Sequence, residues 1–180
     1  MNLATYITCL RIFLILPIAY LTSLNLIEYD LLAMVLFIFA GFTDYLDGYI
    51  ARKTNTASSL GALLDLLADK LLVCLILIWL ININDNIFLV IPSLVIISRE
   101  LIISSIRQFI VERKKTNNLK ISLIAKSKTT IQFLAISMLI VSPQLGVYFI
   151  NLSIITLWIA ALISIISLYT YLRSWQHLLD

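Results

Sequence analysis

Long apolar stretches alternate with short polar segments along the whole chain. Six of the stretches approach or exceed the roughly 20 residues that a helix needs to cross a bilayer. No Gly/Ser/Pro-rich linker divides them. We therefore predict a single all-α domain over residues 1–180, built as a bundle of six transmembrane helices. The predicted spans cover residues 7–25, 30–52, 60–81, 86–111, 126–142 and 149–173.

The composition supports lipid as the main solvent of the chain. Hydrophobic residues make up 61% of the 180 residues and charged residues 13%, with a mean hydropathy of +1.02. A soluble domain is nearer half apolar and a quarter charged. Cys9 and Cys74 lie inside apolar stretches, without CxxC or Cys/His spacing, so neither a disulfide framework nor a zinc site is indicated.

The basic residues predict the orientation of the bundle. An even number of spans puts both termini on one side of the membrane. The loops on the other side, near 24–30, 82–86 and 142–149, contain no Lys or Arg, and all 13 basic residues lie in the other half. Because Lys and Arg are retained on the cytoplasmic side, we expect the termini and the 111–126 loop to be cytosolic.

A basic cytosolic face can attract anionic lipid headgroups or phosphorylated substrates. Nucleic acid is not an expected partner, because no basic module with interleaved aromatic residues lies outside the spans.

Four aspartates lie near the cytosolic ends of the second and third predicted spans. Helical geometry puts Asp44 and Asp47 within roughly 60° of each other, and Asp65 and Asp69 within roughly 40°. The connecting segment 53–59 is short and polar, so the two helices should be antiparallel neighbours with both pairs at one depth. Carboxylate-only ligand sets of this kind suit hard divalent cations, chiefly Mg²⁺ or Mn²⁺.

A simpler interpretation is that these aspartates cap helix ends and pair with Arg52 and Lys70. That interpretation could hold for any one of them. It is unfavourable for all four, since an intramembrane Asp costs ~2.5–3.5 kcal/mol on insertion scales and usually marks a functional site. Gly48 and Gly61, two of the four glycines of the chain, allow either the close approach of a ligand or plain helix packing.

These residues form a motif that resembles the signature of the CDP-alcohol phosphotransferase family: Asp44-x₂-Asp47-Gly48-x₂-Ala51-Arg52-x₈-Gly61-x₃-Asp65-x₃-Asp69. The resemblance implies that the four aspartates ligate two Mg²⁺ or Mn²⁺ ions. It also implies that Asp69 is the catalytic residue that takes the proton from an attacking hydroxyl. By the same resemblance, the cytidine-diphosphate site is lined by Gly48, Ala51, Arg52 and Gly61.

Three further segments resemble the phosphatidylglycerophosphate synthases of this family: 2–11, 98–101 and 125–132. Ala4, Leu66 and Ala125 depart from the usual Pro, Pro and Gly. The likeness covers residues 2–135. It implies transfer of a phosphatidyl group from CDP-diacylglycerol to sn-glycerol 3-phosphate, with release of CMP. It also implies a homodimer; we expect an integral protein of the bacterial inner membrane with its active site facing the cytosol.

Glycerol 3-phosphate is a small dianion, so its site needs cations near the metal centre. The candidate residues for binding the acceptor phosphate are Arg99 and Arg107, roughly 80° apart on one helix, with Lys126 and Lys128 at the start of the next span. The alternative is that these side chains snorkel or follow the positive-inside rule.

Three other functions remain open from the sequence. Another CDP-diacylglycerol-dependent synthase, of the cardiolipin, phosphatidylserine or phosphatidylinositol-phosphate type, would use the same motif with a different acceptor. A divalent-cation transporter would favour acidic residues spread through the membrane depth, and a non-catalytic scaffold would leave the four aspartates unexplained.

Overall fold

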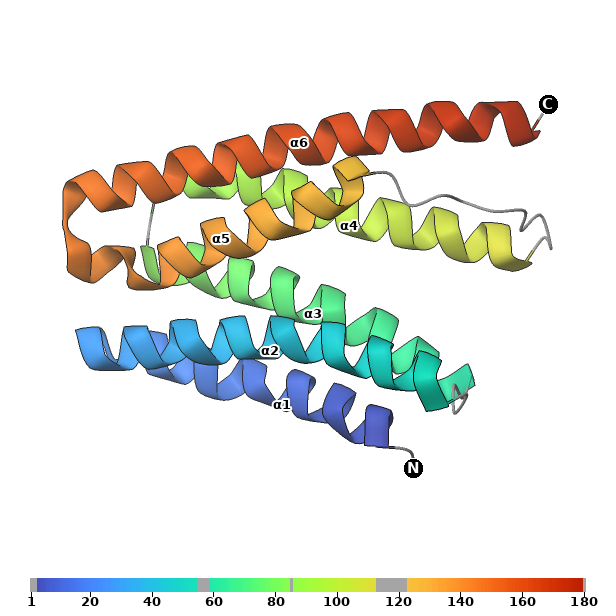
Figure 1. The fold of residues 1–180 in the computed structure, drawn as a ribbon. Coiled ribbons are helices and arrows are strands. Elements are labelled where there is room, and N and C mark those ends of the chain that lie inside the picture. Colours follow the sequence, from blue (N-terminus) through green and yellow to red (C-terminus); the bar gives the residue numbers. More distant parts are fainter. Residues whose placement is uncertain (1–2, 55–58, 85, 113–122, 180) are drawn as a thin grey trace. The chain divides into compact units, whose positions relative to one another are not determined.

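The computed structural model describes residues 3–54, 59–84, 86–112 and 123–179, with side chains described at 6–43, 64, 67–84, 86–106, 108 and 129–173. Within these ranges the chain forms helices and no strand (Figure 1), which confirms the all-α prediction. The helices are α1 (Leu3–Ser23), α2 (Ile27–Thr54), α3 (Ser59–Asn84), α4 (Ile87–Glu112), α5 (Leu123–Leu145) and α6 (Val147–Leu179).

Four of the described helices are long and apolar enough to cross a membrane: α1, α3, α4 and α6, over Tyr6–Ser23, Leu67–Asn84, Ile87–Ile106 and Val147–Arg173. Helix α5 contains a shorter apolar segment, Thr129–Leu145. The described helices therefore fit the predicted helical membrane protein, and the count of six spans stays a prediction.

Polar residues and a glycine define where several helices begin and end. Asn25 follows α1 with a φ of 55°, and Gly146 separates α5 from α6 with a φ of 86°. Both values lie in the left-handed region that Gly and Asn adopt most readily. At the start of α4, the side-chain oxygen of Asn86 accepts a 3.0 Å hydrogen bond from the backbone N–H of Phe88, as an N-cap residue does.

The chain packs as two compact units, each built from two separate segments. The first unit contains residues 1–85 and 136–153, and the second contains 86–135 and 154–180. Helices α5 and α6 contribute residues to both units. The prediction of one domain over 1–180 stays a prediction.

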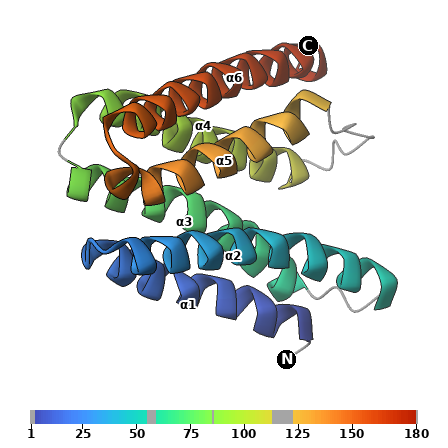
Figure 2. The same ribbon diagram turned by 60° about the vertical axis from the view of Figure 1, so that its left-hand side comes forward.

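In the first unit, α1 packs against both α2 and α3, and α2 also contacts α3. The three helices lie side by side in two views (Figures 1 and 2), with α1 and α3 running in the same direction. Their shared core is apolar and includes Ile18, Phe37, Leu72, Ile76 and Leu77.

Large apolar side chains also cover the outside of this unit. Phe13, Leu16 and Tyr20 on α1 are each more than 60% exposed. A lipid-facing helix surface has this composition, since hydrocarbon tails leave no reason to bury apolar groups.

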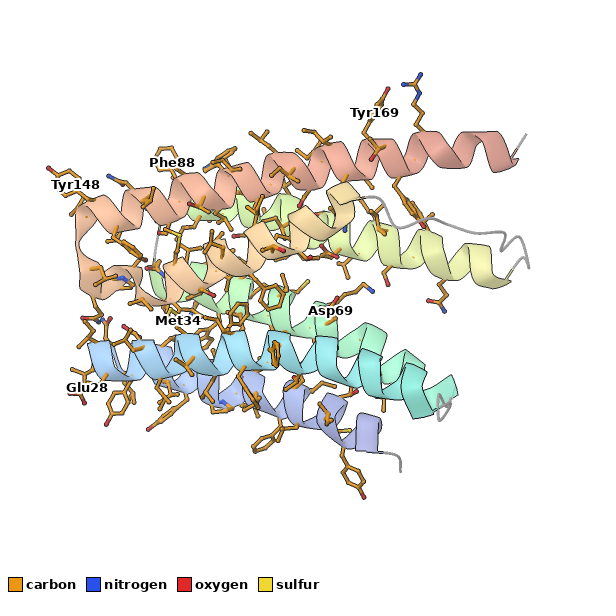
Figure 3. The ribbon with its side chains drawn as sticks, viewed as in Figure 1. Glu28, Met34, Asp69, Phe88, Tyr148 and Tyr169 are labelled. Atoms are coloured by element: carbon orange, nitrogen blue, oxygen red, sulfur yellow. The ribbon has the colours of Figure 1, made fainter. Side chains whose placement is uncertain are left out.

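In the second unit, α6 lies along α4 and the first part of α5. The indole Nε1 of Trp158 donates a 3.2 Å hydrogen bond to the carbonyl oxygen of Phe88. Phe88 lies near the start of α4 (Figure 3). On α6, Tyr169 lies eleven residues after Trp158, toward the C-terminal end of the helix. The buried stripe of α6 in this unit consists largely of small residues: Leu157, Ala160, Ala161, Ser164 and Ser167.

Candidate active site

The backbone of the first unit places the four predicted metal ligands on two contacting helices. Asp44 and Asp47 belong to α2, and Asp65 and Asp69 belong to α3. Asp44 lies ten residues before the end of α2 and Asp69 ten residues after the start of α3. All four therefore lie within ~15 Å, measured along the helices, of the ends that the 55–58 segment joins.

Of these aspartates, only Asp69 has a described side chain, and it is partly buried on α3. Figure 3 shows Asp69 far along the first unit from Glu28, at the opposite end of α2. Among the described side chains, no three His, Cys, Asp or Glu residues gather closely enough to hold a metal. The side chains of Asp44, Asp47 and Asp65 lie outside that set, so their convergence on a metal stays a prediction.

The donors that these positions offer fit the predicted metals chemically. Both helices present carboxylate oxygens, and the sequence brings no His or Cys to the same turns. Hard divalent cations such as Mg²⁺ and Mn²⁺ favour oxygen ligands of this kind.

The predicted cytidine-diphosphate residues cluster at the linked ends of the same two helices. Gly48, Ala51 and Arg52 lie in the last two turns of α2, and Gly61 lies in the first turn of α3. Their side chains are outside the described set, and their role stays a prediction.

Helix α1 adds a buried cation at the level of the acidic residues. Arg11 is 1% exposed and is among the largest fully buried side chains that the structure describes. A 3.0 Å hydrogen bond from Trp79 Nε1 to Thr22 Oγ1 fixes the register of α1 against α3. Arg11 lies eleven residues before Thr22, and Ala68 lies eleven residues before Trp79. Since the two helices are parallel, Arg11 lies at the level of Ala68 and the adjacent Asp69.

A buried guanidinium in a membrane helix requires compensating charge or hydrogen bonds. On the register of α1 and α3, Asp69 is the α3 acid nearest in level to Arg11, and Asp65 follows one turn away. Glu28 and Asp30 occupy the first turn of α2, at the opposite end of the unit. The sequence indicates Arg11 only within the 2–11 segment and as one of the basic residues that predict the orientation. The available signal was a single charge inside an apolar helix.

The second unit holds the best-described member of the predicted acceptor site. Arg99 on α4 is 8% exposed. Its Nη1 lies 3.3 Å from Oε1 and 3.4 Å from Oε2 of Glu100. Its Nη2 donates a 2.8 Å hydrogen bond to Oγ of Ser167 on α6. Neighbours on two helices thus hold the guanidinium at both terminal nitrogens.

A second buried polar contact lies one turn away on α6. Gln132 on α5 is 2% exposed, and its Nε2 donates a 3.2 Å hydrogen bond to Oγ of Ser164. Ser164 and Ser167 share one face of α6, because residues three apart on a helix are neighbours. Neither serine is predictable as a binding partner from the sequence, because a serine in an apolar helix gives no signal beyond small size.

The other predicted acceptor residues have only their helices described. Arg107 lies on α4, and Lys126 and Lys128 lie in the first two turns of α5. Their side chains are outside the described set, so whether they join Arg99 stays a prediction.

Comparison with known proteins identifies the family. The family model described as CDP-alcohol phosphatidyltransferase matches residues 1–166. A protein of Wigglesworthia glossinidia brevipalpis is 36% identical over 182 residues, which cover 99% of this chain and 97% of that protein. A protein of Rickettsia bellii is 40% identical over 177 residues, covering 96% and 94%, respectively. A protein of Pseudomonas fluorescens is 37% identical over 183 residues, covering 99% and 92%.

The chain belongs to the CDP-alcohol phosphatidyltransferase family. Each of the three relatives carries the name CDP-diacylglycerol--glycerol-3-phosphate 3-phosphatidyltransferase. The resemblance predicted from the aspartate motif is confirmed, as is the likeness to the phosphatidylglycerophosphate synthases.

Proposed function

We propose that this chain transfers a phosphatidyl group from CDP-diacylglycerol to sn-glycerol 3-phosphate, forming phosphatidylglycerol phosphate and CMP. The observation that carries the proposal is near full-length similarity to relatives named for this reaction, at 32–40% identity. The complete aspartate motif on α2 and α3 supplies the matching chemistry.

In the proposed reaction, the 1-hydroxyl oxygen of glycerol 3-phosphate attacks the β-phosphorus of CDP-diacylglycerol. The new P–O bond forms as the bond between the β-phosphorus and the bridging oxygen breaks, and CMP leaves with that oxygen. Asp69 accepts the proton of the attacking hydroxyl. A positioned carboxylate base of this kind contributes roughly 10²–10⁴-fold to a rate.

The metal site proposed for this reaction consists of Asp44, Asp47, Asp65 and Asp69, holding two Mg²⁺ or Mn²⁺ ions. Ions held there would neutralise charge on the pyrophosphate. The donor chemistry of α2 and α3 supports this assignment. Gly48, Ala51, Arg52 and Gly61 would then bind the cytidine-diphosphate part, with Arg52 on a phosphate.

The acceptor phosphate is proposed to bind Arg99, together with Arg107, Lys126 and Lys128. The support is that Arg99 is buried on a membrane helix, where ionisable residues usually mark functional sites. A guanidinium also suits a phosphate dianion, because its planar N–H groups can bond two oxygens at once.

The proposed setting is the bacterial inner membrane. Six spans would leave both termini and the active site on the cytosolic side, where glycerol 3-phosphate is available. The distribution of Lys and Arg along the chain supports this orientation. We also propose that the chain functions as a homodimer, on the basis of the family resemblance.

One assay tests the function directly. Purified full-length protein is given CDP-diacylglycerol with Mg²⁺ or Mn²⁺ and a single acceptor, and CMP release is followed. We expect turnover with glycerol 3-phosphate and background release with serine, inositol 1-phosphate or phosphatidylglycerol. The Asp69→Asn variant is the control for chemistry at the proposed site. Preferred turnover with any other acceptor would replace the proposed substrate while leaving the family assignment intact.

A further inference from the structure

We propose that Ser167 on α6 is a positioning residue for the acceptor site, and that Ser164 supports the same site through Gln132. This inference rests on the proposed function, in which Arg99 binds the phosphate of glycerol 3-phosphate. It gives α6 a part in substrate binding beyond crossing the membrane.

The contact between Arg99 and Ser167 has the geometry of a specific hydrogen bond. The Nη2–Oγ distance is 2.8 Å, at the short end of the range for N–H···O bonds. The two residues are 8% and 6% exposed, so water cannot easily replace either partner. Glu100 approaches Nη1 of the same guanidinium, so Arg99 is restrained on two sides.

The register of α6 along α4 fixes this contact. Trp158 and Ser167, nine residues apart on α6, bond to Phe88 and Arg99, eleven residues apart on α4. These two hydrogen bonds, about three helical turns apart, connect α6 to α4 at two separate levels. The Ser167 hydroxyl therefore meets Arg99 at a level set by the packing of the whole helix pair.

Gln132 and Ser164 extend the same arrangement to α5. Their bond is 3.2 Å long, and both residues are buried, at 2% and 0% exposure. Lys126 and Lys128, two proposed phosphate-binding residues, lie one to two turns before Gln132 on the same helix. The bond to Ser164 therefore fixes the part of α5 that follows those lysines.

Other hydroxyls on α6 behave differently. Ser153 donates a 2.7 Å hydrogen bond to the carbonyl of Ile150, and Thr170 donates a 3.0 Å bond to the carbonyl of Ser167. Such bonds within a helix are the usual way for Ser and Thr to satisfy their hydroxyls. Ser164 and Ser167 instead accept side-chain bonds from other helices, which is the feature that separates positioning from plain packing.

The expected effect is on acceptor affinity. An arginine side chain has many rotamers, and holding it in its binding geometry reduces the entropy lost when substrate binds. Without the Ser167 hydroxyl, Arg99 would bind the same phosphate from a less restrained state. Because substrate and transition state both carry this phosphate, the loss should appear in KM rather than in kcat.

The test uses the full-length protein and the CMP-release assay with the Ser167→Ala variant. We expect KM for glycerol 3-phosphate to rise about three- to tenfold, with kcat and KM for CDP-diacylglycerol within about twofold of wild type. Ser164→Ala should shift the same KM by a smaller factor. Ser153→Ala is the matched control, a fully buried serine on the same helix, and should leave all three constants unchanged.

A double variant identifies the route of the effect. If Ser167 acts through Arg99, adding Ser167→Ala to Arg99→Ala should raise KM no further. Should Ser167→Ala not fold, Ser167→Cys serves as the second variant, since it keeps the volume and weakens the acceptor. A KM for glycerol 3-phosphate equal to wild type in the folded variant would overturn the inference and leave the proposed function standing. Absence of glycerol 3-phosphate turnover by the wild-type protein would overturn both.

Discussion

The indole of Trp79 on α3 donates a 3.0 Å hydrogen bond to the hydroxyl of Thr22 on α1. The bond joins residues 57 positions apart in the sequence and lies toward the end of the first unit remote from Asp69. Thr22 also bonds the carbonyls of Ile18 and Ala19 in its own helix. The bond marks the register that puts Arg11 at the level of Asp69, and the packing of α1 against α2 and α3 also maintains that register.

Removing this bond should reduce stability but not catalysis. Thr22→Val keeps the shape of the side chain and leaves the N–H of Trp79 without its acceptor, at an expected cost of about 1–3 kcal/mol. The midpoint of thermal unfolding in detergent should fall, with kcat/KM nearly unchanged at temperatures where the variant is folded. Ser23→Ala is the control, because Ser23 is exposed and bonds only within α1. Equal midpoints for Thr22→Val and wild type would contradict the assigned role of the bond.

Arg11 should be required for activity. We expect Arg11→Met to lower kcat/KM by roughly tenfold or more, because breaking a buried charge arrangement leaves the remaining charges uncompensated. Arg11→Lys should retain part of the activity, since it keeps the charge but not the planar donor geometry. Arg173→Met, at an exposed arginine on α6, should behave as wild type. Full activity in a well-folded Arg11→Met protein would show that Arg11 has only a packing role.

Activity should depend on a divalent cation. Four carboxylates on two contacting helices cannot all stay ionised at close range without one, so EDTA should abolish CMP release and Mg²⁺ or Mn²⁺ should restore it. EDTA saturated with Mg²⁺ beforehand is the control for the chelator itself. Asp44→Asn should lose metal-dependent activity, whereas Asp30→Asn, at a buried acid near the other end of α2, should keep it. Undiminished CMP release in free EDTA would exclude the proposed metal site.

Acceptor binding and chemistry should separate in two variants. Arg99→Ala should raise KM for glycerol 3-phosphate roughly ten- to hundredfold with kcat little changed, since hydrogen bonds to charged groups contribute ~1.5–3 kcal/mol. Asp69→Asn should instead lower kcat by roughly 10²-fold or more, because the base is removed. KM for CDP-diacylglycerol should move little in Arg99→Ala. The proposed acceptor site fails if Arg99→Ala leaves the acceptor KM at its wild-type value.

The orientation can be tested with single cysteines in a protein lacking Cys9 and Cys74. Asn82→Cys should react with a membrane-impermeant thiol reagent added to intact cells, because the loop near it contains no Lys or Arg. Lys115→Cys, in a segment outside the described residues, should react only after the cells are opened. The opposite pattern would put the active site on the wrong side for cytosolic glycerol 3-phosphate.

The helices themselves were predictable from the sequence, because apolar runs of spanning length report local structure. The aspartate motif was also predictable, since its spacing is fixed within two neighbouring helices. The burial of Arg11 and the bonds of Ser164 and Ser167 were not. They depend on how far one helix is shifted and rotated against another. The sequence of α1 or α6 alone does not predict that shift or rotation.

The complete burial of Arg11 also bears on how the protein is made. Helix α1 is translated before α2 and α3. A charge within the apolar part of a lone helix raises its insertion free energy, by ~2.5–3.5 kcal/mol at the helix centre. In the folded protein Arg11 is 1% exposed, shielded by the packing of α1 against α2 and α3. During synthesis, the packing that buries Arg11 is complete only after α3 has been translated. Helix α1 therefore depends on α2 and α3 to remain in the bilayer. We expect the three helices to integrate into the membrane cooperatively rather than one by one.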